Sequence, residues 1–240
     1  MDIISSLAII AFAALIHASF QLSVSVLTLL SGHAIGSKAA HAKLLRLSCG
    51  FLTGVGVMTL LLLTFTAFML QKSFGNQVPI LAWAVACGLL VGLGIAVWGF
   101  YYRKEKGTSL WLPRGIARYL TERTKATKHS SEAFGLGLSS VIAEGIFILA
   151  PIVIASLVLI RLDTFWQLIG IALYTLVSLL SLLIVGGMIG SGHKLSHIQK
   201  WREDNKRFLQ FAAGSGLLIL GCYVYVDQVI TVTAHAAGGM

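Results

Sequence analysis

The sequence predicts an all-α integral membrane protein with six transmembrane helices arranged as a 3+3 inverted-topology repeat. The first observation is composition: of 240 residues, 57% are apolar and 11% charged, and mean hydropathy is +0.86. A soluble domain is about a quarter charged. The second is several charge-free apolar runs of roughly 20 residues or more. The third is an uneven distribution of Lys and Arg between the connections.

Six apolar segments are long enough to span a bilayer, and they cover residues 3–30, 49–70, 79–102, 134–160, 164–190 and 208–230. The first follows an acidic start, MDIISS, and its apolar run is too long for a signal-peptide core, so we expect it to remain as a helix. The resulting organisation is a repeat at 1–102, a basic connection at 103–133, a second repeat at 134–230 and a tail at 231–240.

Nearly all the cations lie in three alternate connections, 31–48, 103–133 and 191–207. Of the 18 Lys and Arg residues, only Lys72 and Arg161 lie elsewhere. The positive-inside rule therefore places these connections in the cytoplasm and both termini outside, as in a multi-pass protein of the cell membrane. The net charge of +9 is then explained by the basic cytoplasmic connections. It favours anionic lipid as a partner and gives no indication of nucleic acid.

The central connection carries an amphipathic pattern within 109–128, SLWLPRGIARYLTERTKATK. Leu112, Ile116, Tyr119 and Leu120 share one helical face, and the basic residues lie on others. This arrangement is typical of a helix lying in the plane of the membrane surface. We expect it on the cytoplasmic leaflet.

The fourth span contains Glu144, and a carboxylate at membrane depth is costly unless it is paired, protonated or hydrated. The first span contributes His17, Gln21 and Ser25. Such polar side chains either hold helices together or line a cavity. Pro151 lies seven residues beyond Glu144 and should kink its helix.

The two halves of the chain can be overlaid. Aligning the first and fourth spans at one offset places His17 opposite Glu144 and Phe20 opposite Phe147. Aligning the third and sixth spans matches Gly92, Gly94, Gly99 and Tyr101 with Gly214, Gly216, Gly221 and Tyr223. Three spans per half make the second copy inverted. We expect Gly92, Gly94, Gly214 and Gly216 to act with Pro151 as hinge positions.

The inversion predicts where His17 and Glu144 lie. At about 1.5 Å per residue, His17 is ~21 Å from the outer face and Glu144 ~15 Å from the cytoplasmic face. Both then fall in the middle third of an apolar core ~30 Å thick. Secondary transporters bind substrates at this depth, between inverted repeats. The alternative is that Glu144 is protonated and only fastens helices through hydrogen bonds.

Other chemistries have little support. His33, His41, His193 and His197 lie in cytoplasmic connections and are candidates for sampling a metal ion, or are solvated residues without acidic partners. The three cysteines are far apart, with no CxxC pair. No span contains HExxH or GxSxG, so we expect neither an enzyme nor a bound cofactor.

The layout of six spans, inverted halves and a long basic central loop resembles the lysine-exporter superfamily, which includes exporters and the DsbD/CcdA-type electron carriers. The electron carriers have a cysteine in spans one and four, where this chain has His17 or Gln21 and Glu144. The resemblance thus implies the architecture and a general transport role, without a thiol relay.

The leading hypothesis is a small secondary transporter for a cation, metal ion or small polar solute across the plasma membrane. Protons would couple through His17 and Glu144 at a midplane site. A homodimer is compatible with the sequence. The alternatives are a non-transporting scaffold or docking protein, and a cysteine-free relative of the DsbD/CcdA-type proteins.

Overall fold

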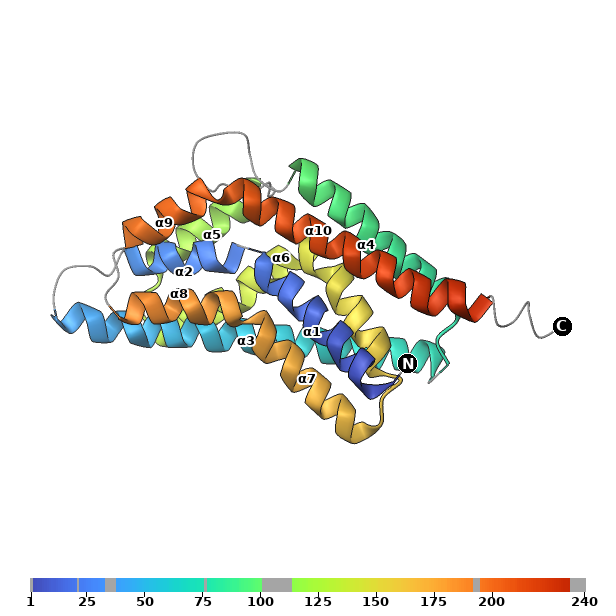
Figure 1. The fold of residues 1–240 in the computed structure, drawn as a ribbon. Coiled ribbons are helices and arrows are strands. Elements are labelled where there is room, and N and C mark those ends of the chain that lie inside the picture. The colour runs from blue at the N-terminus through green and yellow to red at the C-terminus, as the bar shows by residue number, and fades with distance from the viewer. Residues whose placement is uncertain are drawn as a thin grey trace.

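The computed structural model describes residues 2–20, 22–32, 38–75, 77–100, 114–191 and 195–233, and within these residues all regular structure is helical (Figure 1). The helices, in chain order, are α1 (Ile3–Ser19), α2 (Leu22–Gly32), α3 (Lys38–Phe74), α4 (Ile80–Phe100), α5 (Arg114–Ala126), α6 (Ser130–Leu159), α7 (Thr164–Ser178), α8 (Leu180–Gly190), α9 (Leu195–Asp204), α10 (Lys206–Tyr225) and the π-helical turn η1 (Val226–Ile230).

Four helical stretches are individually long and apolar enough to cross a membrane, namely Ala42–Phe74, Ile80–Phe100, Ser130–Leu159 and Lys206–Thr233. Two bent helix pairs, α1 with α2 and α7 with α8, each bend by 47°, and each pair adds one span if its two helices cross the membrane together. The protein is therefore a multi-pass helical membrane protein with four to six spans. The predicted first and fifth segments are present, but each is interrupted, whereas the sequence had indicated continuous helices.

The break after α1 is a change of backbone conformation. Asp2 caps the start of α1 by accepting a hydrogen bond from the Ser5 amide (2.9 Å), and hydrogen bonds from Ser5 hold the pKa of the Asp2 carboxyl below its usual value. At the other end, Phe20 is extended, with φ −73° and ψ 142°. Its amide donates to the His17 carbonyl, 3.1 Å away. Extended geometry cannot continue the α-helical hydrogen-bond pattern, so α2 begins as a new helix.

Two close helix pairs form the framework around these breaks. α3 and α6 run in the same direction in contact, and a Cβ added at Gly54 would lie 2.2 Å from the Phe134 carbonyl oxygen. α4 and α10 run in opposite directions and pack through Gly94 and Gly214. Small residues let membrane helices approach closely, so both interfaces depend on them.

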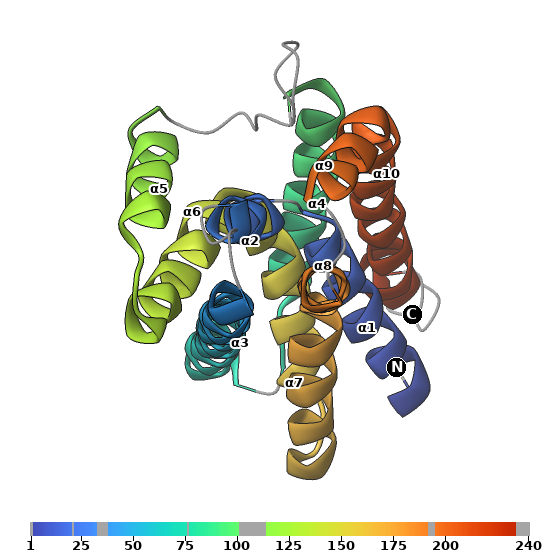
Figure 2. The ribbon, with the colours of Figure 1, turned by 90° about the vertical axis from the view of Figure 1, so that its left-hand side faces the viewer.

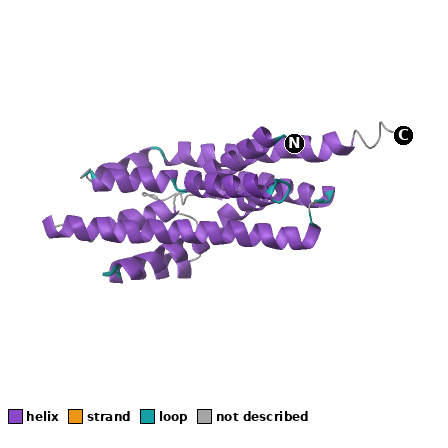
Figure 3. Ribbon diagram, turned by 90° about the horizontal axis from the view of Figure 1, so that it is seen from below, coloured by secondary structure: helices purple, strands orange, loops and turns teal. Residues whose placement is uncertain are grey.

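The axes of most helices lie along the long dimension of the molecule, as the view from below shows (Figure 3). The start of α1, the turn from α3 to α4, the turn from α6 to α7 and the end of α10 gather at one end (Figure 1). The ends of α2 and α8 lie at the opposite end with α5 and α9. We call these the terminal end and the α9 end. Large apolar side chains such as Leu61, Phe65 and Phe68 on α3 are more than half exposed, which fits contact with lipid.

α5 lies in the connection for which an in-plane helix is predicted. Figure 2 shows α5 from its side, while α2, α3 and α8 are seen nearly along their axes. Leu120 is buried and Ile116 packs against the core, whereas Tyr119 is 49% exposed. α5 contacts α2 and α6. Leu112 lies outside the described residues.

Candidate functional site

Glu144 caps the first turn of α2. It lies on α6, and 3% of its surface is exposed. Its Oε1 accepts a hydrogen bond from the Leu22 amide and its Oε2 accepts one from the Ser23 hydroxyl, each 3.0 Å long. The amides that begin a helix have no partner within it, and no water is available in a bilayer core. A carboxylate also favours the positive end of the helix dipole. The break therefore makes Glu144 tolerable, and Glu144 stabilises the break.

A second serine extends this contact along α6. Ser140 lies one turn before Glu144, and its hydroxyl is 3.2 Å from that of Ser23. Ser140 itself donates to the Gly137 carbonyl, 2.8 Å away. Both serines are buried, so the carboxylate lies in a chain of satisfied hydroxyl groups.

The end of α1 receives a partner from the second bent pair. The Ser181 hydroxyl, on α8, donates to the Ala18 carbonyl, 2.5 Å away. The two breaks thus lie beside each other, and a cavity of about 10 Å³ remains between them. Its lining includes His17, Phe20, Ser23, Glu144 and Ser181. This volume holds one water molecule at most.

His17 and Glu144 line the same cavity, as their predicted pairing requires, but they have different partners. His17 Nδ1 shares a hydrogen bond of 3.1 Å with the Tyr174 hydroxyl, and the two ring centroids are 5.8 Å apart. Tyr174 lies on α7 and is fully buried. His17 therefore connects α1 to α7, while Glu144 connects α6 to α2.

Ser25, a predicted site residue on α2, accepts a hydrogen bond from Arg202. The Arg202 Nη2 atom donates to the Ser25 hydroxyl, 2.8 Å away, and Arg202 is only 3% exposed although it lies on α9. Ser25 is three residues beyond Leu22, one turn along α2. The Arg202 guanidinium and the Glu144 carboxylate therefore both hydrogen-bond to the first turn of α2, from different helices.

The remaining predicted site positions lie in different places. Gln21 falls outside the described residues. Pro151 is buried inside α6, which continues through it to Leu159, so the break beside Glu144 belongs to α1 and α2 instead. Of the predicted hinge glycines, Gly94 and Gly214 lie between α4 and α10, Gly216 faces Ile16 of α1, and Gly92 has open space around it.

The histidine candidates do not form a described metal site. His33 and His193, and the side chain of His41, lie outside the described residues, whereas His197 is exposed on α9. Across the described part of the chain, no group of three or more His, Cys, Asp or Glu residues could hold a metal ion.

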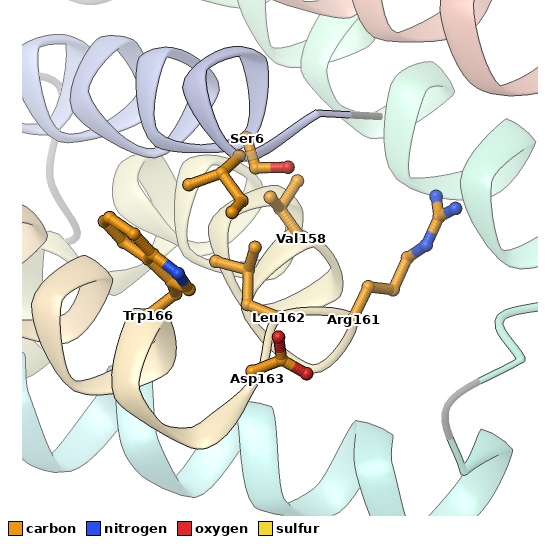
Figure 4. Close-up of a pocket in the computed structure, with 7 residues that line it drawn as sticks. Ser6, Val158, Arg161, Leu162, Asp163 and Trp166 are labelled. Atoms are coloured by element: carbon orange, nitrogen blue, oxygen red, sulfur yellow. The ribbon is translucent and has the colours of Figure 1, made fainter.

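A larger cavity, of about 140 Å³, lies at the terminal end between α1 and the turn from α6 to α7 (Figure 4). Ser6, Asp163 and Trp166 line it. The Arg161 guanidinium points away from the other labelled side chains, and it hydrogen-bonds to Gln228 and lies 5.9 Å from the Trp83 ring. This cavity is separate from the Glu144 site and contains none of its residues.

Sequence reasoning missed Ser140, Tyr174, Ser181 and Arg202. Ser140 could have been found, because it lies four residues before Glu144 and shares its helical face. Arg202 could not, since nothing in a basic connection distinguishes one cation from its neighbours.

No model of a known protein family matches this chain, and neither does any curated protein or solved structure. The fold defines the class of protein as a helical multi-pass membrane protein.

Proposed function

We propose that this protein is a small secondary transporter of the cell membrane that moves a cation, a metal ion or a small polar solute, with Glu144 as its proton- or ion-binding carboxylate. One observation carries the proposal: Glu144 is buried where two broken helices meet. Transporters build midplane sites from interrupted helices, because the broken ends supply backbone groups that unbroken helices lack. Intramembrane carboxylates are functional by default for the same energetic reason.

The helix packing supports the 3+3 inverted repeat. In an inverted repeat, α1, α3 and α4 of the first half correspond to α6, α7 and α10 of the second. The α1–α7 contact then corresponds to the α6–α3 contact, and the α1–α10 contact corresponds to the α6–α4 contact. All four contacts are present. Phe20 and Phe147, which the overlay pairs, have ring centroids 5.6 Å apart. Residues related by a two-fold axis meet each other only near that axis. The continuous α6 departs from this symmetry, since its counterpart α1/α2 is broken.

The charge distribution supports an orientation. The α9 end carries α5 and α9, which belong to two of the three basic connections, so it is the cytoplasmic end under the positive-inside rule. Both termini would then be outside, and α5 would lie on the inner leaflet beside anionic lipid. This layout retains the resemblance to the lysine-exporter superfamily.

A second candidate function is favoured by the small volume of the cavity. A cavity of about 10 Å³ does not reach either end, as expected if Glu144 is a permanent cap within a non-transporting scaffold. In the transporter proposal the same geometry is the closed state of an alternating-access cycle. The two candidates differ in whether the cavity opens and whether Glu144 exchanges its proton.

The deciding experiment is a flux assay on the full chain in proteoliposomes, with a pH-sensitive dye inside and Na⁺, K⁺, Mn²⁺, Zn²⁺ or a neutral or cationic amino acid added in turn. We expect proton-coupled movement of at least one probe. Glu144→Gln should reduce it by about tenfold or more, because the titratable group is gone. The matched control is Glu122→Gln, which removes an exposed carboxylate on α5. Vesicles silent to every probe would favour the scaffold.

A further inference from the structure

Two opposite charges are buried in this protein, and both groups hydrogen-bond to the first turn of α2. Among the described residues, Glu144 is the one buried carboxylate and Arg202 the one buried Lys or Arg. Removing a single charge from water costs several kcal/mol unless an opposite charge or several hydrogen bonds compensate it. The burial of Arg202 on α9 therefore requires an anionic or strongly polar environment.

The first turn of α2 provides the connection. Leu22 and Ser23 donate to the Glu144 carboxylate, and Ser25 accepts from the Arg202 guanidinium. Arg202 thus reaches the site from the α9 end, while Glu144 reaches it from α6.

We propose that Arg202 is a tethered counter-ion of Glu144 that holds the position of a transported cation, and that the substrate is accordingly a cation. With Arg202 in place the two buried charges balance. A cation binding beside Glu144 would leave two positive charges against one negative charge, so it must displace the guanidinium. An anion would meet the carboxylate itself. Displacing Arg202 moves α9, which opens the site toward that end.

This inference rests on the proposed transport function but is tested without flux. The test uses the full chain in detergent, with Cys49→Ser, Cys87→Ala and Cys222→Ser, and with a single reporter, Val24→Cys. Val24 lines the cavity, is 2% exposed and has no polar role. The rate of thiol modification is measured with two reagents of similar size, the trimethylammonium-ethyl and sulfonatoethyl methanethiosulfonates, which differ in the sign of their charge.

We expect slow labelling of the parent by both reagents. Arg202→Gln should speed labelling by the cationic reagent about tenfold or more, as expected from the loss of a charge-assisted hydrogen bond. The anionic reagent should gain much less, because Glu144 is left without its counter-ion. The matched control, Arg207→Gln, removes an exposed cation from α10 and should leave both rates unchanged. Arg202→Lys should restore the parental preference.

Equal gains for both reagents, or labelling of Arg202→Gln as slow as the parent, would overturn the inference. If Arg202→Gln is not monodisperse on size exclusion, Ser25→Ala decides the matter, since it removes the acceptor and leaves the charge. It should then raise both rates by a smaller factor, and unchanged rates would count against the inference. Active vesicles combined with unchanged labelling would reject the inference alone, whereas silent vesicles would reject the transport proposal.

Discussion

The two bent helix pairs share an angle of 47° but are stabilised by different chemistry. At the α7/α8 break, Leu179 stays helical, with φ −84° and ψ −6°, and the Leu183 amide already donates to its carbonyl (2.8 Å). At the α1/α2 break, Phe20 is extended, and the adjoining backbone uses side chains from two other helices, Glu144 and Ser181. The backbone hydrogen bonds at the α7/α8 break are local, while those at the α1/α2 break depend on side chains from other helices.

The difference shows which break is able to respond to chemistry. The stability of a bend whose hydrogen bonds are local does not change when a distant group is protonated or displaced. A break capped by a carboxylate changes its stability whenever that carboxylate changes its charge or partner. The α1/α2 break is therefore the element through which Glu144 would influence the rest of the protein.

The largest expected effect comes from removing the cap. Glu144→Ala leaves the Leu22 amide unsatisfied away from water and should lower the free energy of unfolding by about 2–4 kcal/mol. Glu144→Gln keeps an acceptor and should cost clearly less. Thermal unfolding of the purified protein in detergent measures both, with Glu122→Ala on the exposed face of α5 as the control. If Glu144→Ala is as stable as that control, the break does not depend on the carboxylate.

A smaller effect is expected from matched serines at the two breaks. Ser23→Ala removes the donor to Glu144 Oε2 and the contact with Ser140, and should cost about 1–2 kcal/mol in the same measurement. Ser178→Ala removes only a hydrogen bond to the Thr175 carbonyl within the same helix. It should therefore lower the free energy of unfolding by less than about 0.5 kcal/mol. Equal costs would mean that the two breaks depend on their surroundings to the same degree.

An effect somewhat smaller than that of Ser23→Ala is expected at the junction of the breaks. Ser181→Ala removes the donor to the Ala18 carbonyl and should cost about 0.5–1.5 kcal/mol. Carbonyls tolerate a missing partner better than amides do, so this loss should stay below that of Glu144→Ala. Hydrogen exchange of the α1 and α2 amides would show whether the loss is confined to this break. A cost above that of Glu144→Ala would reverse the assigned roles of the two caps.

Much of the fold was predictable because a bilayer restricts what a sequence can do. Long apolar runs must be helices, since backbone groups have no other partners there. The need of Glu144 for polar partners was predictable, because a carboxylate in such a run is costly without them, and the structure supplies two. The cavity that Glu144 shares with His17 followed from the overlay of the halves, and the cavity lining agrees with that expectation.

The sequence by itself therefore determined the membrane class, the positions of the apolar segments and the presence of a carboxylate, Glu144, in one of them. The tertiary structure alone decided where the helices break. α6 continues through Pro151 as one helix, whereas the backbone turns at Phe20, where the sequence has no proline or glycine to indicate a break. The tertiary structure also selected Arg202 from among the basic residues. In both cases the physical reason is the same. A freed amide or a buried charge is stable only when a residue far away in the sequence supplies its partner, and the local sequence does not show which residue that is.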